Sequence, residues 1–190
     1  MPDQARLRRT ILASTLLLAV FLLSTGGWLL FRSLKSAGPE RPVTLAEFTE
    51  SGVKVVIRLE LDAQGKDILA VTFTAVASGF HVYSKDVPRE GIDGLGRPTL
   101  LELPPGAKMQ ATGSLQESVA PLVEPIQKDL PDLHAYPEGP VSLYLPVQLP
   151  QTAGEITDAV SVTYMACSQK GCKKPVEGKI IPVSYRTKAP

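Results

Sequence analysis

Cysteine and histidine are scarce in this chain of 190 residues, which contains two of each. A single cysteine pair is too little to be the scaffold of a disulfide-rich fold, and about 150 residues can bury an adequate core without one. The sequence also lacks a serine nucleophile motif, a zinc-protease motif, a phosphate loop and any internal repeat. The cysteine pair is therefore the chemical feature that the sequence offers.

Strong charge of one sign is also missing after residue 37. Residues 1–37 carry five Lys/Arg and one Asp, which leaves 15 basic and 18 acidic residues in the rest of the chain. This remainder is mildly acidic and has neither a basic stripe nor an arginine-rich arm. No nucleic acid is therefore expected as a partner.

A run of 21 residues without a charge, 11–31, follows the first ten residues. It is long enough to cross a hydrocarbon core of about 30 Å as a helix. Three arginines in 1–10, against Arg32 and Lys35 after the run, favour a cytoplasmic N-terminus and an exported C-terminal domain. A cleaved signal peptide with its apolar region at 11–23 is the alternative, but no A-x-A-like cleavage site follows it. We expect an uncleaved, single-pass transmembrane anchor.

The rest of the chain is expected to divide into a linker at 32–45 and a domain at 46–190. Alternation of apolar and polar residues predicts strands at 53–61, 68–77, 80–84, 98–103, 141–149, 156–167 and 176–185. A short helix is expected at 118–130, interrupted by Pro121 and Pro125. Short strands without a sustained amphipathic helix predict an all-β sandwich.

Both cysteines belong to one predicted hairpin. Four residues, Ser168-Gln169-Lys170-Gly171, separate Cys167 from Cys172 and form its loop. Facing residues of an antiparallel pair lie within disulfide reach, so the two sulfurs should be able to bond. Strand phase places Cys167 on the more polar face, opposite to Tyr164 and Ala166. We therefore expect the cysteine pair outside the apolar interior.

Two interpretations of this pair concern a disulfide. A redox couple is favoured because closing a ring of about six residues stabilises a fold by only about 2 kcal/mol on the chain-entropy model. It is also favoured by Lys170, Lys173 and Lys174, which would stabilise the attacking thiolate. The alternative is a structural disulfide that pins the hairpin of a non-catalytic, membrane-anchored interaction module.

Metal binding is a third interpretation of the pair. Met165, His81 and His134 could join two thiolates in a copper or zinc site, which would make this a copper-handling domain. Neither histidine has ligand spacing to the cysteines, so we expect no metal and no other cofactor. Tyr83 and Tyr164 are candidates for lining the site, as are Lys170 and Lys173, although strand aromatics more often belong to a core.

The sequence resembles the N-terminal periplasmic domain of the thiol:disulfide interchange protein DsbD, over roughly residues 53–183. The resemblance rests on five segments in order, Gly79-Phe80-His81-Val82-Tyr83, Gly94-Leu95-Gly96-Arg97-Pro98-Thr99, Leu101-Glu102-Leu103-Pro104-Pro105-Gly106, Tyr136-Pro137-Glu138-Gly139, and Tyr164-Met165-Ala166-Cys167 with Cys172. It implies an immunoglobulin-like β-sandwich in the periplasm; with the anchor expected at 11–31, this places the protein at the inner (cytoplasmic) membrane. It also implies thiol:disulfide exchange with thioredoxin-like redox proteins and a membrane electron donor.

The resemblance further implies that Cys172 forms the mixed disulfide with partners and that Cys167 resolves it. Three features depart from the family pattern. Met165 stands where the family usually has glutamine, and Lys173-Lys174-Pro175 stands where it has Pro-Pro. No phenylalanine in 107–140 corresponds to the aromatic tip of the family's cap over the cysteines.

Overall fold

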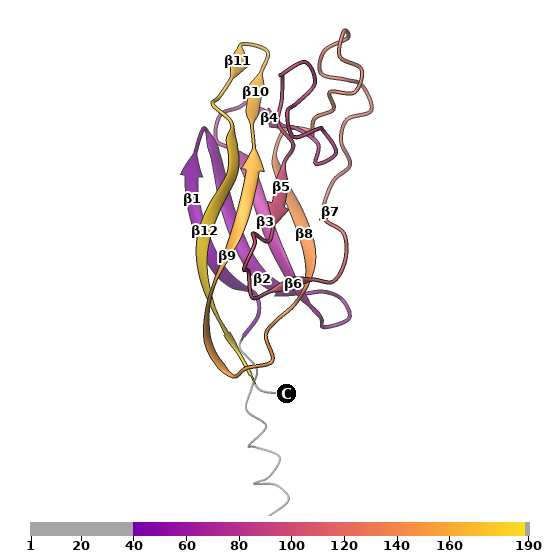
Figure 1. Ribbon diagram of the computed structural model, residues 1–190. Coiled ribbons are helices and arrows are strands. Elements are labelled where there is room, and N and C mark those ends of the chain that lie inside the picture. The colour runs from indigo at the N-terminus through magenta and orange to yellow at the C-terminus, as the bar shows by residue number, and fades with distance from the viewer. Residues whose placement is uncertain (1–39, 189–190) are drawn as a thin grey trace, which may run out of the picture. The chain divides into compact units, whose positions relative to one another are not determined.

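The computed structural model describes residues 40–188, which form strands and turns without a helix (Figure 1). The strands in chain order are β1 (Val43–Glu50), β2 (Val53–Leu61), β3 (Asp67–Ala75), β4 (His81–Val82), β5 (Leu100–Glu102), β6 (Gln110–Ala111), β7 (Gln116–Glu117), β8 (Pro140–Gln148), β9 (Gly154–Tyr164), β10 (Ala166–Ser168), β11 (Gly171–Cys172) and β12 (Val176–Thr187). The all-β prediction is confirmed for these residues, and the arrangement is consistent with an immunoglobulin-like sandwich. Between residues 40 and 188, no helix has the length and apolar character needed to span a membrane. The predicted anchor at 11–31 lies outside the described residues.

Most of the predicted strands are present. The bounds of β2 coincide with the prediction, and those of β3, β8 and β12 lie within two residues of it. The strand predicted at 156–167 is instead two strands, because β9 ends before Met165 and β10 begins after it. Strand β1 was not predicted, and its first residue, Val43, lies in the range expected as linker.

The first sheet has the order β1-β2-β3-β8, with all neighbours antiparallel, and the short strands β6 and β7 pair with β8. Strand β1 turns into β2 at Ser51 and Gly52, whose φ angles are 48° and 74°. Positive φ at both residues is what a two-residue type I′ hairpin turn requires. Alternate residues of β2 then face the core with no exposed surface: Val53, Val55, Ile57 and Leu59.

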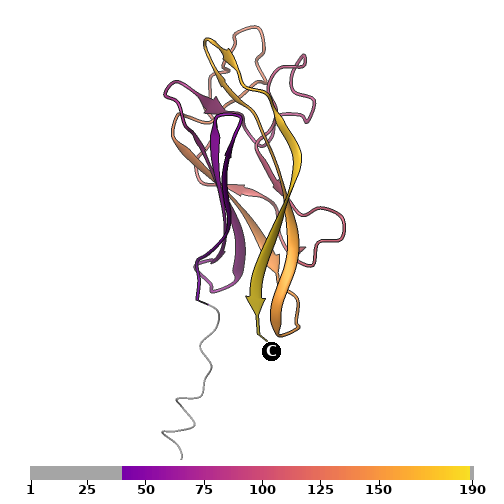
Figure 2. The same cartoon turned by 90° about the vertical axis from the view of Figure 1, so that its left-hand side faces the viewer.

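The second sheet has β9 at its centre, between β12 and β5. Beyond Met165 the chain continues into a small sheet with the order β11-β10-β4. Figures 1 and 2 show β10 and β11 at one end of the sandwich, whereas β1 starts and β12 finishes at the other end. The two cysteines, in β10 and β11, therefore lie at the end opposite to the one where the described chain begins.

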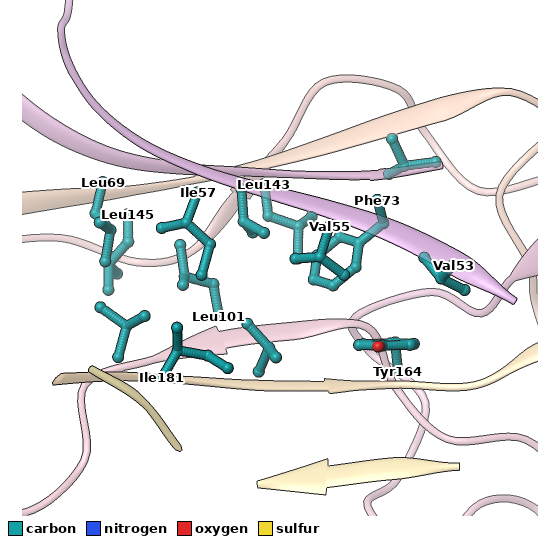
Figure 3. Packing of buried hydrophobic residues seen from close by; sticks show 14 of the residues in the cluster. Val53, Val55, Ile57, Leu69, Phe73, Leu101, Leu143, Leu145, Tyr164 and Ile181 are labelled. Atoms are coloured by element: carbon teal, nitrogen blue, oxygen red, sulfur yellow. The ribbon is translucent and has the colours of Figure 1, made fainter. Parts of the chain in front are cut away.

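The main core lies between the two sheets (Figure 3). In this view Ile57, Phe73 and Leu143 of the first sheet point toward residues of the second sheet, which include Tyr164 and Ile181. The rings of Phe73 and Tyr164 have centroids 5.4 Å apart and are tilted by 57°, an arrangement that aromatic pairs favour. Burial between two sheets explains why the strands of this region alternate so regularly.

Residues 118–135, which we call the capping segment, contain no helix, so the predicted helix at 118–130 is wrong. The segment folds back on itself instead, since Leu122 N–H donates to the Ala135 carbonyl at 2.8 Å and Ile126 N–H donates to the Leu133 carbonyl at 3.2 Å. A proline has no N–H to donate, and the residue before it is restricted away from the helical region. Two prolines within five residues therefore prevent a regular helix here.

Asp158 ties β9 to the loop before β6 and to β12. Its carboxylate accepts hydrogen bonds from the backbone N–H of Lys108, Met109 and Ala159 and from the Tyr185 hydroxyl, at 2.8 to 2.9 Å. Burial raises the pKa of this carboxyl group, but the four hydrogen bonds outweigh burial, so that the pKa lies below its ordinary value. The ionised carboxylate thus stabilises the folded state.

We expect Asp158→Asn to lower the free energy of unfolding at neutral pH by about 2–4 kcal/mol, because an amide NH₂ cannot accept hydrogen bonds and leaves buried donors unpaired. The folded pKa is depressed, so the contribution is present above the unfolded pKa of about 3.9 and is lost as pH falls through the folded value. Urea unfolding as a function of pH measures both effects. The exposed control Asp129→Asn should stay within about 0.5 kcal/mol of the parent. Equal losses in the two variants would contradict this role.

Candidate functional site

The two cysteines form a disulfide across the predicted hairpin. Cys167 in β10 is paired directly with Cys172 in β11, their sulfurs are 2.00 Å apart and their Cα atoms 4.0 Å apart. Gly171 has a φ of 138°, a region that favours glycine. The Ser168 hydroxyl accepts the N–H of Lys170 at 3.2 Å, which fixes the loop. The predicted hairpin and the contact between the two sulfurs are both confirmed.

Strand β10 has a partner on each side. On one side it pairs with β11, and on the other it pairs antiparallel with β4, where Cys167 faces His81 and Ala166 faces Val82. Cys167 thus occupies the centre of a row of three residues, with Cys172 and His81 as its neighbours. Directly opposed residues of an antiparallel pair share one face of the sheet.

The two cysteines differ in burial. Cys172 is exposed, whereas only 2% of the surface of Cys167 is accessible. The expectation that the pair lies outside the apolar interior is therefore wrong for Cys167. Its strand phase was predicted well, because Tyr164 and Ala166 pack in the main core and Cys167 does not. The opposite face, however, is covered by other apolar residues rather than by water.

A second, smaller apolar cluster provides this cover. Its buried members, besides Cys167, are Tyr83, Val87, Leu130, Leu133 and Ala135. Leu130, Leu133 and Ala135 belong to the capping segment. Leu133 is completely buried, and a Cβ atom added to Gly96 would approach its Cδ1 to 2.8 Å. The capping segment is thus closely packed in the cluster that contains the buried cysteine.

The structure separates the two tyrosines that were predicted to line the site. Tyr83 belongs to the cluster around Cys167. Tyr164 lies in the main core, where its hydroxyl donates to the Glu50 carbonyl at 3.3 Å. Burial raises the pKa of both phenols, so neither supplies a charge at neutral pH. Tyr83 is the one of the two that packs with the buried cysteine.

The predicted lysines lie at the exposed edge of the hairpin. Lys170 is in the loop and borders an open groove together with Phe80 and Glu138. The Lys173 ammonium lies 5.3 Å from the centre of the Phe80 ring, a distance at which a cation is attracted to an aromatic face. Both lysines therefore place positive charge at the edge that carries Cys172.

His81 is the site residue that sequence reasoning did not assign to the redox couple. It is half-buried, and its Nε2 is buried without a hydrogen-bond partner among residues 40–188. Its ring meets the Tyr83 ring edge-on, with centroids 5.4 Å apart. Burial lowers the pKa of His81, although the nearby Glu138 carboxylate opposes this. A strand was predicted at 80–84, but no local pattern shows that it pairs with β10.

His134 and Met165 were the other metal-ligand candidates. Nδ1 of His134 lies 3.1 Å from the Leu122 carbonyl, within the capping segment. Met165 packs partly buried against the second cluster. Within residues 40–188, no three or more His, Cys, Asp and Glu side chains are grouped in a way that could hold a metal ion.

Fold and site together define an all-β sandwich domain that carries a half-buried cross-strand disulfide at one end. The sequence matches no protein-family model and no curated protein. Among solved structures, it is similar to the N-terminal domain of DsbD from Neisseria meningitidis in the reduced form, with 15% identity, a TM-score of 0.42, and coverage of 70% of this chain and 90% of that chain. A likeness at this TM-score supports no conclusion, so the chemistry has to come from the residues of this chain.

Leu133 offers a test of the cover. The substitution Leu133→Ala is made together with Cys172→Ser, so that Cys167 is the sole thiol. We expect it to speed alkylation of Cys167 by iodoacetamide about tenfold, because a loss of 1.4 kcal/mol of packing changes an opening equilibrium by that factor. The control is Leu143→Ala, which removes an equally buried leucine from the main core. If both variants accelerate alkylation equally, the capping segment does not specifically protect Cys167.

Proposed function

We propose that this domain exchanges thiols and disulfides with other proteins through Cys167 and Cys172. The observation that carries the proposal is the unequal exposure of a bonded pair: Cys172 is exposed at the tip of the sandwich and Cys167 is covered. Exchange proceeds by attack of a thiolate on one sulfur of a disulfide, and access decides which sulfur is attacked. A partner would thus attack Cys172.

The exchange can be written with electrons and protons balanced. A partner thiolate bonds to Sγ of Cys172, the bond between Cys172 and Cys167 breaks, and Cys167 leaves with the electron pair. The partner's second thiolate then attacks the partner sulfur that is bonded to Cys172, and Cys172 leaves as a thiolate. The partner has lost two electrons, and the dithiol formed here takes up two protons. Transfer to an oxidised partner is the reverse sequence.

A structural disulfide is the second candidate, because the burial of Cys167 favours it. A covered disulfide resists reduction, and an interaction module needs no reaction at its cysteines. Two features argue for exchange. The ring closed by the bond has about six residues, so its effect on stability is only about 2 kcal/mol. Moreover, a bond that serves stability alone gains nothing from presenting one sulfur to solvent at the tip of a domain.

Thioredoxin-like redox proteins and a membrane electron donor are the proposed partners. The lysines beside Cys172 would attract partners with an acidic surface and would favour the Cys172 thiolate. An exchange domain needs access more than a deep pocket, and the exposed hairpin offers it. The direction of electron flow follows from the potentials of the two partners.

The proposal is tested by the reduction potential of the Cys167/Cys172 couple and by the reactivity of each thiol alone. In glutathione buffers we expect a potential between about −180 and −280 mV, the range of exchange proteins. Cys167→Ser should form a mixed disulfide with oxidised thioredoxin through Cys172, and Cys172→Ser should react about tenfold more slowly or worse, because Cys167 is covered. A potential well below about −300 mV, with equal reactivity of the two variants, would identify a structural disulfide.

We also propose a periplasmic location, with the run at 11–31 as a single-pass anchor in the inner membrane. The charge asymmetry around the run and the presence of a disulfide support it. The full chain should stay in the membrane pellet after alkaline carbonate washing, and a chain starting at residue 40 should be released. Release of the full chain by carbonate would contradict the anchor.

A further inference from the structure

Cys167 faces a chemical difficulty that Cys172 does not. When the disulfide opens, Cys167 leaves as a thiolate inside an apolar cluster, with 2% of its surface exposed. An apolar environment disfavours the charged form of a thiol, so the reaction needs a nearby group that exchanges a proton with the Cys167 sulfur. The buried members of the cluster around this sulfur contribute no acid or base that works near neutral pH.

His81 lies where such a group is needed. It is paired directly with Cys167 across β4 and β10, and opposed residues of an antiparallel pair share a face with Cβ atoms about 4.5–5.5 Å apart. Its Nε2 is buried and has no hydrogen-bond partner within residues 40–188. A buried nitrogen without a partner requires an explanation. In the disulfide the Cys167 sulfur has no proton to donate, but the reduced thiol has one.

Building on the proposed exchange activity, we infer that His81 is the acid–base partner of Cys167. In the resolving step, Nε2 of the neutral imidazole takes the proton of the Cys167 thiol. The thiolate bonds to Sγ of Cys172, and the partner leaves as a thiolate with the electron pair of the mixed disulfide. The imidazolium proton passes through water to the partner's thiolate. In the reverse direction, the imidazolium returns a proton to Cys167 as it leaves.

The charged surroundings of His81 are consistent with this role. Glu138, in the segment before β8, favours the imidazolium, while the ring of Tyr83, the residue after β4, meets the His81 ring edge-on. On the hairpin side, Lys170 borders the same groove as Glu138, and Lys173 lies over Phe80. Burial prevails and keeps the pKa of His81 below its usual value, so the ring is neutral at neutral pH and able to accept a proton.

Two phases of one reaction test the inference. The reduced full-length chain is mixed with dithiobis(nitrobenzoate): Cys172 is modified first, and Cys167 then displaces the second nitrothiobenzoate within the same molecule. We expect the second phase to reach a plateau above about pH 6.5 in the parent chain. In His81→Gln the second phase should be at least about tenfold slower at neutral pH. Its rate should keep rising with pH toward the pKa of a thiol, about 8.5. His134→Gln, at the other histidine of the chain, is the control and should match the parent.

A second readout requires no exchange at all. In Cys172→Ser, the nuclear magnetic resonance titration of the His81 ring should have its midpoint about one pH unit lower than in Cys167→Ala made together with Cys172→Ser, because a thiol that donates to Nε2 stabilises the neutral imidazole. A histidine that only supports the packing would change the second-phase rate by the same factor at every pH and give the same midpoint with and without Cys167, which would overturn the inference. If the potential identifies a structural disulfide while the midpoint still shifts, the exchange activity fails but the pairing of His81 with Cys167 stands.

Discussion

The interruption at Met165 is the feature on which the site depends, because one long strand changes its pairing partners there. Up to Tyr164 the strand pairs with β12 and β5 and contributes to the main core. From Ala166 onward it pairs with β11 and β4. The short strand β10 therefore has Cys172 on one side and His81 on the other, and Cys167 between them turns away from the main core. A continuous ladder with β12 would leave no room for this row of residues.

The buried apolar residues form two separate clusters, one between the large sheets and one at the tip. The main core holds the two large sheets together, while the cluster around Cys167 contains few residues and is covered by the irregular capping segment. Between its ends this segment is fixed by isolated backbone hydrogen bonds such as the one from Leu122 to Ala135. Regions with few such bonds open at a lower cost than the sheets do. Opening of the capping segment alone would therefore expose Cys167 without disturbing the main core, while Cys172 is exposed already.

Local periodicity predicted the long strands and the cysteine hairpin, because a half-buried strand repeats every two residues. It missed β1, where partly buried positions weaken the alternation, and it could not show that β4 pairs with β10, since that contact joins residues 86 positions apart, His81 and Cys167. The resemblance implied a cap over the cysteines within 107–140, but the residues that cover Cys167 could not be assigned, for the same reason. Strand phase shows on which face of the strand a side chain lies, but distant segments decide whether that face is exposed to solvent.

The unpaired nitrogen of His81 links the packing of the tip to its redox balance. A buried polar atom without a partner costs about 1–3 kcal/mol, and in the oxidised form this cost is present. The hydrogen bond that we propose between Nε2 and the Cys167 thiol would remove this cost on reduction. Because 1.4 kcal/mol corresponds to about 30 mV for a two-electron couple, recovering about 1 kcal/mol raises the potential by about 20 mV. This upward shift of the reduction potential favours the reduced form. His81, the proposed acid–base partner of Cys167, would therefore also make the disulfide easier to reduce.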